Sequence, residues 1–284
     1  MMTDSIGPLF GLKFHPFRPD VPVDALCVSP EIESFVFRVE HQVRDGGFVS
    51  VVGDPGTGKS SALRVLAARL ERHKDVSVGV LTRPQSNNAD FYRELGHLFG
   101  VTLSPHNRWA GSKALRETWL AHIDQSRTRP VLIVDEAQEM KVSVLAELRL
   151  LSSMNLDARA LLTVVLAGDE RLTAKYRVPD VLPIASRIRT RLQLGYLEPE
   201  RLRDVLDHLL DHAGRHDLIT DEVKHALVTH AHGNLRSLTT MADNLLSHAQ
   251  QHELHQIDEQ TFFDVFQLRP EPAKPEPRKA KRGR

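Results

Sequence analysis

Residues 48–60 read FVSVVGDPGTGKS, and this stretch decides the fold that the sequence predicts. The first five residues, apolar or β-branched except for one serine, predict a short buried strand. The next eight match G-x-x-x-x-G-K-[ST], a loop whose backbone N–H groups surround a phosphate where the following helix begins. We therefore expect a nucleotide site that includes Gly53, Asp54, Pro55, Gly56, Thr57, Gly58, Lys59, Ser60 and Ser61.

Two residues of this loop and two further residues carry the expected chemistry. Lys59 is placed to reach the β- and γ-phosphates of a nucleotide, and the Ser60 hydroxyl to ligate Mg²⁺. The apolar strand expected at 131–134 ends in Asp135 and Glu136. Asp135 is placed to hold Mg²⁺ through water, and Glu136 to orient or deprotonate the attacking water. A carboxylate pair after a strand is a weak signal alone, but with the loop it predicts a Mg²⁺-dependent nucleoside triphosphatase.

Strands and helices alternate through most of the chain. We expect strands at 48–52, 76–81, 131–134, 161–167 and 191–194, and helices at 30–43, 88–99, 112–125 and 142–153. This alternation is typical of βαβ units and a parallel sheet. After Pro199 the pattern predicts helices alone, near 200–213, 220–231, 234–250 and 258–267. The predicted parts are an N-terminal segment at 1–28, an α/β nucleotide-binding domain at 29–196, a helical lid at 197–268 and a basic tail at 269–284.

The composition of the 284 residues is that of an ordinary globular protein, with 41% hydrophobic residues and a formal net charge of +0. This balance excludes a bulk polycation. The last fourteen residues carry six cationic and two acidic side chains, so the tail is net positive and the rest net negative. Such an arm either attracts nucleic acid or only aids solubility. The single cysteine, Cys27, favours a reducing compartment, and no apolar run is long enough for a membrane span. We therefore expect a cytoplasmic protein with no membrane partner.

The order of these features resembles the AAA+ ATPases over roughly residues 8–268. The shared features are the phosphate loop, the strand ending in Asp135 and Glu136, a later strand, an arginine cluster, and Gly233-Asn234-Leu235-Arg236 in a helical lid. Three further stretches are similar to the ExeA-like branch: FGLKFHPF at 10–17, DEAQ at 135–138 and AGDERL at 167–172. That branch includes secretion ATPases and lies close to the ATPase helpers of DDE transposases, of the MuB, IstB, TniB and TnsC kind. The resemblance implies an α/β AAA+ P-loop NTPase that assembles as rings or filaments.

The resemblance also implies roles for three kinds of residue. Arg236 resembles the sensor arginine that reaches the γ-phosphate of its own subunit, although a helix arginine can also be plain surface. One of Arg187, Arg189 and Arg191 would act as an arginine finger on a neighbouring subunit, and we favour Arg187. Asp169 stands where a polar sensor such as Asn or Thr is usual, so we expect slow hydrolysis.

The leading functional hypothesis is an ATP-dependent DNA-binding regulator of transposition. It would assemble on duplex DNA and recruit or activate a transposase. Arg83, Arg108 and Lys113 are candidate DNA contacts, although ordinary surface charge is the simpler explanation for each of them. Two alternatives stay open: a nucleotide-controlled protein scaffold that binds no DNA, and an ExeA-like secretion ATPase with a separate membrane partner.

Overall fold

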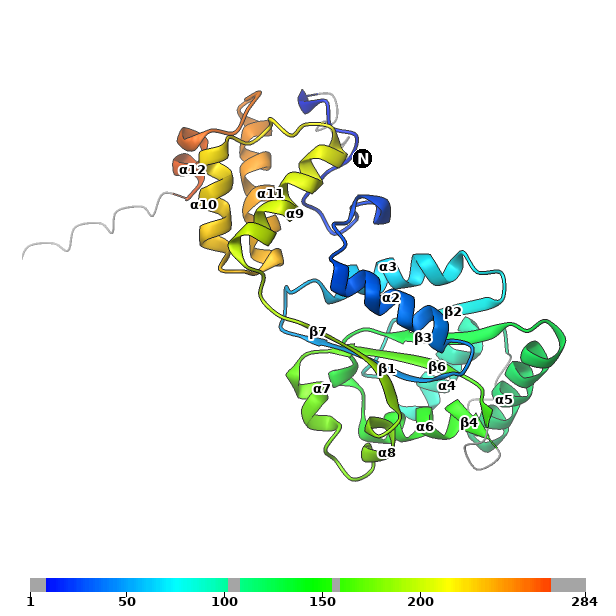
Figure 1. Ribbon diagram of the computed structural model, residues 1–284. Helices are drawn as coiled ribbons and strands as arrows, with labels where there is room; N and C mark the ends of the chain where they lie inside the picture. The colour runs from blue at the N-terminus through cyan, green and yellow to red at the C-terminus, as the bar shows by residue number, and fades with distance from the viewer. Residues whose placement is uncertain (1–8, 102–107, 155–158, 267–284) are drawn as a thin grey trace, which may run out of the picture.

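The core of the molecule is a five-stranded parallel sheet, seen in the lower half of Figure 1. The computed structural model describes residues 9–101, 108–154 and 159–266. The strands are β1 (Gly47–Gly53), β2 (Val76–Leu81), β3 (Arg129–Val134), β6 (Thr163–Gly168) and β7 (Ile188–Leu194). Their order in the sheet is β2-β3-β6-β1-β7. The predicted α/β fold with a parallel sheet is thus confirmed.

Helices cover both faces of the sheet, because the side chains of each strand alternate between two apolar clusters. One face packs against α2 (Pro30–Gln42) and α3 (Lys59–Glu71). The other packs against α4 (Asn88–Leu98), α5 (Arg108–Gln125), α6 (Val142–Ser152), α7 (Glu170–Lys175) and α8 (Leu182–Ala185). In β3, Val131 and Ile133 face the first cluster while Leu132 and Val134 face the second. The resulting three layers bury the sheet and leave its carboxyl edge for chemistry.

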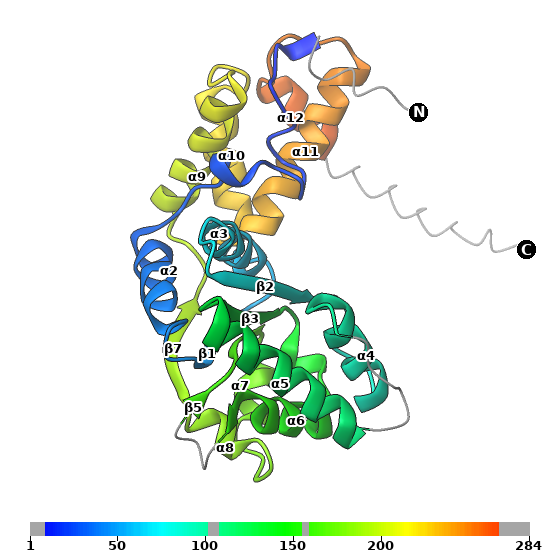
Figure 2. The same cartoon turned by 90° about the vertical axis from the view of Figure 1, so that its right-hand side faces the viewer.

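A four-helix lid follows the sheet and stands above it in Figure 2. Its helices are α9 (Pro199–Ala213), α10 (Asp221–Ala231), α11 (Leu235–Gln251) and α12 (Glu259–Phe266). Phe10, Leu12 and Phe17 of the N-terminal segment belong to the apolar cluster of this lid. The Lys13 backbone N–H donates to the Ala213 carbonyl at 2.9 Å, which ties the same segment to α9. The division into an N-terminal segment, an α/β domain, a helical lid and a basic tail stays a prediction, and the described part of the N-terminal segment packs against the lid.

Several helices and strands begin at residues other than the predicted ones. The strand expected at 161–167 begins at Thr163, because the backbone N–H groups of Leu161 and Leu162 both donate to Ser152 O. The helix expected at 112–125 begins earlier, at Arg108. The strand expected at 191–194 begins at Ile188. From the sequence we predict neither the short helices α7 and α8 nor the small antiparallel pair of strands β4 (Ser153–Met154) and β5 (Arg159–Ala160).

Candidate nucleotide-binding site

The predicted phosphate loop lies between β1 and α3, as the sequence requires. Gly53 ends β1, residues 54–58 form the turn, and Lys59, Ser60 and Ser61 open α3. Gly56 and Gly58 have φ values of 84° and 97°, a left-handed conformation that side chains other than glycine seldom adopt. The Thr57 hydroxyl donates to Asp54 O at 2.8 Å and closes the turn. These features leave backbone N–H groups at the N-terminus of α3 for a phosphate.

The Lys59 ammonium lies inside this loop. It is 7% exposed and donates to Gly53 O at 2.8 Å and to Asp54 O at 3.0 Å. A buried ammonium attracts an anion, and the two carbonyls satisfy it in the absence of one. Lys59 is thus in place to exchange these carbonyls for the β- and γ-phosphates of a nucleotide.

The two predicted halves of the site meet at Ser60 and Asp135. The Ser60 hydroxyl donates to Asp135 Oδ2 at 2.9 Å, although 75 residues separate them in the chain. A hydroxyl and a carboxylate are hard oxygen ligands of the kind that Mg²⁺ takes together with phosphate oxygens and water. The residues present therefore fit ATP with Mg²⁺: the loop would hold the phosphates, and Ser60 and Asp135 the metal.

Glu136 follows Asp135 in an unusual backbone conformation, with φ 52° and ψ 38°. Its side chain is exposed at the carboxyl edge of the sheet, and its Oε2 accepts a hydrogen bond from Gln138 Nε2. The left-handed backbone turns the chain directly into η2 (Ala137–Glu139), a short 3-10 helix. The arrangement presents a carboxylate beside the metal ligands, where a base for water would be needed.

Asp169, the expected sensor, lies at the end of β6 but is tied to a neighbour. Its carboxylate caps α7 through the Arg171 backbone N–H at 2.9 Å and pairs with the Arg171 guanidinium at 2.8 Å. These hydrogen bonds from Arg171 hold the pKa of Asp169 below its usual value. Arg171 also pairs with Glu139 Oε1 at 2.9 Å. Asp169 therefore stays an anion engaged with Arg171.

The lid touches the phosphate loop through the start of α11. Asn234 Nδ2 donates to Pro55 O at 3.0 Å, and the Arg236 backbone N–H donates to Gly56 O at 3.3 Å. A Cβ on Gly56 would lie 2.2 Å from Asn234 Oδ1, so only glycine permits this approach. The exposed side chain of Arg236 thus begins beside the loop. From the sequence we assign Asn234 no role of its own, although an Asn before an apolar helix is a signal for an N-cap.

The favoured finger arginine, Arg187, lies at the opposite end of the sheet from the phosphate loop. Ile188 is level with Phe48 at the start of β1, whereas the loop follows Gly53. Six residue steps at about 3.3 Å put Arg187 about 20 Å from the loop of its own chain. Arg187 precedes β7 and donates to Pro183 O at 2.6 Å. Arg189 is exposed near the start of β7, and Arg191, level with Ser50 in the middle of β1, donates to Ala185 O at 3.3 Å.

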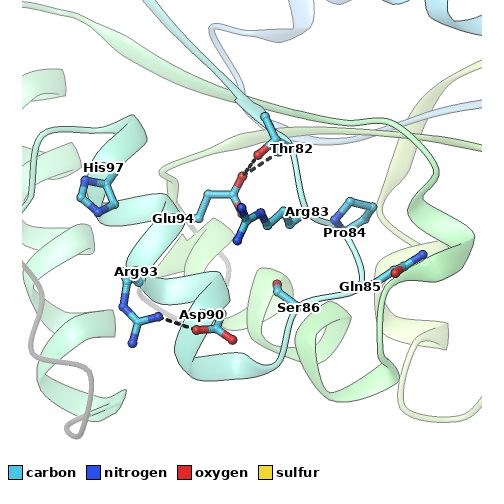
Figure 3. A pocket seen from close by; sticks show the side chains of 9 residues that line it. All are labelled: Thr82, Arg83, Pro84, Gln85, Ser86, Asp90, Arg93, Glu94 and His97. Atoms are coloured by element: carbon cyan, nitrogen blue, oxygen red, sulfur yellow. Dashed lines mark hydrogen bonds and ion pairs between the residues drawn. The ribbon is translucent and has the colours of Figure 1, made fainter.

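The candidate DNA contacts do not form one cluster. Arg83 is exposed at the carboxyl end of β2 and lines a surface pocket with Arg93 and His97, shown in Figure 3. Two carboxylates of the same pocket, Asp90 and Glu94, balance the arginines in charge. Lys113, on α5, pairs with Glu117 at 3.7 Å. Arg108 is the first residue of α5, and its side chain lies outside the described part of the structure.

Fold and site together define a class of protein. A P-loop, a strand-end carboxylate pair and a helical lid on a parallel sheet make the AAA+ P-loop NTPase fold, and residues 42–175 match the family described as AAA domain. General secretion pathway protein A of Aeromonas hydrophila is 31% identical over 190 residues, which cover 65% of this chain and 34% of the relative. The chain thus spans about a third of that relative's length. Over these residues the chain is similar to the AAA domain family and to part of General secretion pathway protein A.

Solved structures show the same fold at low sequence identity. Cdc6p from Pyrobaculum aerophilum superposes with a TM-score of 0.70 at 15% identity, over 85% of this chain and 67% of that one. The Aeropyrum pernix ORC1 protein in complex with DNA gives 0.67 at 18% identity, over 88% and 67%. The Thermotoga maritima RuvB Holliday junction branch migration motor gives 0.59 at 14% identity, over 88% and 72%. In this chain, no helix among the described residues combines the length and apolar character that crossing a bilayer requires.

Proposed function

We propose that this protein is a Mg²⁺-dependent ATPase whose sites are completed between neighbouring subunits. The observation that carries the proposal is the contact of Ser60 with Asp135 at 2.9 Å, which joins the phosphate loop to the acidic strand end. The position of Arg187, at the other end of the sheet from its own loop, favours a role on the nucleotide of a neighbour.

Each residue then has a defined task. Lys59 leaves the two loop carbonyls and neutralises the phosphates, while Ser60 and Asp135 hold Mg²⁺. The metal supplies charge stabilisation for phosphoryl transfer when bound. Glu136 accepts the proton of the attacking water. Arg187 of the next subunit balances the charge that develops on the leaving phosphates.

The substitution Glu136→Gln tests this assignment. It keeps the shape of the side chain and removes the base, so ATP should bind with nearly unchanged affinity while turnover falls about 100-fold or more. Glu170→Gln, an exposed carboxylate at the start of α7, is the matched control and should keep the wild-type rate. Wild-type turnover in Glu136→Gln would remove Glu136 from the mechanism.

The finer proposal is that the assembled ATPase binds duplex DNA and acts in transposition with a transposase. Its support is the exposed Arg83 beside Arg93 on the rim of the sheet, repeated in every subunit of an assembly. Among proteins of the same fold, the Aeropyrum pernix ORC1 protein has been solved in complex with DNA. Because the pocket also holds two carboxylates, a single subunit should bind DNA weakly.

A salt titration of duplex-DNA binding with ATP, with ADP and without nucleotide tests the DNA proposal. We expect tight, sequence-independent DNA binding in the presence of ATP but not of ADP or without nucleotide. The affinity for DNA should fall steeply as salt rises, because phosphate contacts release counterions. Arg83→Ala should weaken binding and flatten the salt slope, whereas Arg44→Ala, an exposed arginine beyond the end of α2, should not. Equal binding in all three nucleotide states would contradict the proposal.

A secretion-type ATPase is the second candidate, and the match to General secretion pathway protein A favours it. In that case the same ATPase site would act on a protein partner, and duplex DNA would change neither assembly nor turnover. Measuring ATP turnover and particle size with and without duplex DNA therefore separates the two candidates. The scaffold alternative predicts ATP-dependent assembly with no turnover in either condition.

A further inference from the structure

Gln138 joins the candidate base to the end of a neighbouring strand. The residue lies in η2 and is 3% exposed. Its Nε2 donates to Glu136 Oε2, and its Oε1 accepts the backbone N–H of Asp169 at 3.3 Å. The amide thus spans from the carboxylate that would activate water to the residue that follows β6.

The orientation of this amide is fixed by its partners. A carboxylate oxygen can only accept a hydrogen bond, and a backbone N–H can only donate one. A flipped Gln138 amide would place two acceptors together on one side and two donors together on the other. Only the observed orientation satisfies both neighbours, so the amide holds Glu136 through a donor and Asp169 through an acceptor.

Gly168 provides the space for this bridge. A Cβ at residue 168 would lie 2.4 Å from Gln138 Oε1 and 3.2 Å from Leu172 Cβ. The φ of Gly168 is not positive, so the backbone there would accept an alanine. The nearest obstacle to a side chain is therefore the Gln138 amide, with Leu172 next at 3.2 Å.

A second connection holds the same two segments together. Arg171 pairs with Asp169 on one side and with Glu139 on the other, at 2.8 and 2.9 Å. Gly168 is also level with Val52, the residue before the phosphate loop begins. The end of β6 is thus fixed between η2 and the loop, and Gln138 is the link that reaches Glu136.

We propose that Gln138 is a positioning residue that sets the Glu136 carboxylate for its reaction with water. The inference rests on the proposed ATPase function. Glu136 is exposed and stands on a left-handed turn, so its side chain would otherwise occupy several rotamers. The amide holds Oε2 and leaves Oε1 to accept the proton of the water. Since small displacements of a reacting group can cost about 100-fold in rate, this restraint should appear in kcat.

Two substitutions test the role through the separate effects on kcat and on ATP binding. Gln138→Leu removes both hydrogen bonds and should lower kcat about tenfold or more, with the KM for ATP and ATP affinity within twofold of wild type. Gln138→Glu can still accept the Asp169 N–H but cannot donate to the Glu136 carboxylate, so it should lower kcat in the same way.

Gln42 provides the matched control. It is also a buried glutamine with two side-chain hydrogen bonds, to Phe48 O at 3.1 Å and from the Thr190 hydroxyl at 2.7 Å. Gln42→Leu should therefore cost similar stability while kcat stays near the wild-type value. If Gln42→Leu lowers kcat as much as Gln138→Leu does, the effect is structural and the proposal fails.

A double-mutant cycle of Gly168→Ala with Gln138→Ala tests the same contact from both sides, so the result does not depend on how well a single variant folds. Gly168→Ala should push the amide away and lower kcat, but it should add little in a Gln138→Ala background, where the amide is absent. Additive losses would overturn the proposal. Wild-type kcat in every Gln138 variant would also overturn it.

The parallel variant Glu136→Gln separates failure of this inference from failure of the ATPase assignment. If Glu136→Gln abolishes turnover and the Gln138 variants leave it unchanged, Gln138 alone is wrongly assigned. If Glu136→Gln also leaves turnover unchanged, or the wild-type protein hydrolyses no ATP, both proposals fail.

Discussion

At the scale of single residues, the loop lysine shows how the site is prepared for an anion. Lys59 is held by two backbone carbonyls of its own loop. Loss of the ammonium removes the charge that would attract phosphate, and also removes one hydrogen-bond donor from each of the carbonyls of Gly53 and Asp54. The residue therefore contributes to ligand affinity and to the shape of the loop.

We predict that Lys59→Ala lowers ATP affinity at least about 100-fold and abolishes every ATP-dependent activity. Titration with a fluorescent ATP analogue measures the loss. Lys74→Ala, an exposed lysine in the turn after α3, is the control and should bind as wild type does. Tight ATP binding by Lys59→Ala would place the nucleotide elsewhere.

The residues that could be predicted from the sequence are those whose chemistry is local. The loop at 53–60 and the pair Asp135 and Glu136 are contiguous in the chain and follow recognisable strands. Gln138 belongs to the DEAQ motif and Asn234 to the GNLR motif, but Gln138 accepts from Asp169, 31 residues away, and Asn234 donates to Pro55, 179 residues away. Nothing in a single sequence specifies such distant pairs, so their roles needed the structure.

At the scale of elements, the N-terminus of α11 rests on the phosphate loop. Asn234 is both the N-cap, since its Oδ1 accepts the Ser237 N–H at 3.1 Å, and the donor to Pro55 O. The positive end of the helix dipole therefore approaches the position of the phosphates. Lid orientation and loop geometry are coupled through one side chain.

We predict that Asn234→Ala destabilises the protein by about 1 kcal/mol and weakens ATP binding several-fold. Asn234→Ser should keep most of the stability, because serine also caps helices, yet lose affinity as alanine does. Thr220→Ala removes the cap of α10 away from the loop, so it should cost stability alone. Thermal unfolding and ATP titration give the two readouts, and unchanged affinity in both Asn234 variants would exclude the coupling.

Helix α9 carries a histidine that responds to pH. Burial, with the neighbouring His212, lowers the pKa of His208 below its ordinary value. The folded state therefore favours neutral His208, whereas the unfolded chain takes up the proton first as pH falls below about 6.5. The contribution of this group to stability is lost on acidification and stays constant above that pH.

We predict that the melting temperature of wild type falls more steeply between about pH 7 and pH 5.5 than that of His208→Gln. One proton limits the difference to about 1.4 kcal/mol per pH unit. His225→Gln, an exposed histidine on α10, should retain the wild-type slope. Parallel curves for His208→Gln and wild type would show that His208 titrates normally.

Element boundaries were less predictable than element types. The helix α5 starts before Gly111, although glycine usually indicates a helix end. Gly111 packs against α4: a Cβ added to it would lie 3.7 Å from the ring of Tyr92. The strand β7 begins among arginines because Thr190 and Leu192 face inward while Arg189 and Arg191 face out. Tertiary packing, which the chain order does not show, decided both starts.

At the scale of the whole molecule, the two halves of the proposed active site lie at opposite ends of one sheet. The phosphate loop follows β1, and Arg187 precedes β7, the neighbouring parallel strand. A single subunit therefore carries both halves but cannot combine them.

We predict that Arg187→Ala lowers turnover about 1,000-fold while the ATP affinity of the monomer stays within twofold. Mixing Arg187→Ala with Lys59→Ala should restore part of the activity, because the intact loop of one variant meets the intact arginine of the other. Arg189→Ala serves as the control and should keep most of its turnover alone. No recovery on mixing, with normal turnover in Arg187→Ala, would point to Arg191 or to a site complete in one subunit.

The separation of Arg187 from its own phosphate loop also gives any open row of subunits two unlike ends. At one end Arg187 has no neighbouring nucleotide to act on, and at the other a bound nucleotide has no arginine from a neighbour. That last ATP would outlive all the others, so the row would keep an unhydrolysed cap and lose subunits mainly from its interior or from the opposite end. A closed ring has no such cap. The lifetime of the last nucleotide would thus report whether the protein forms rows or rings.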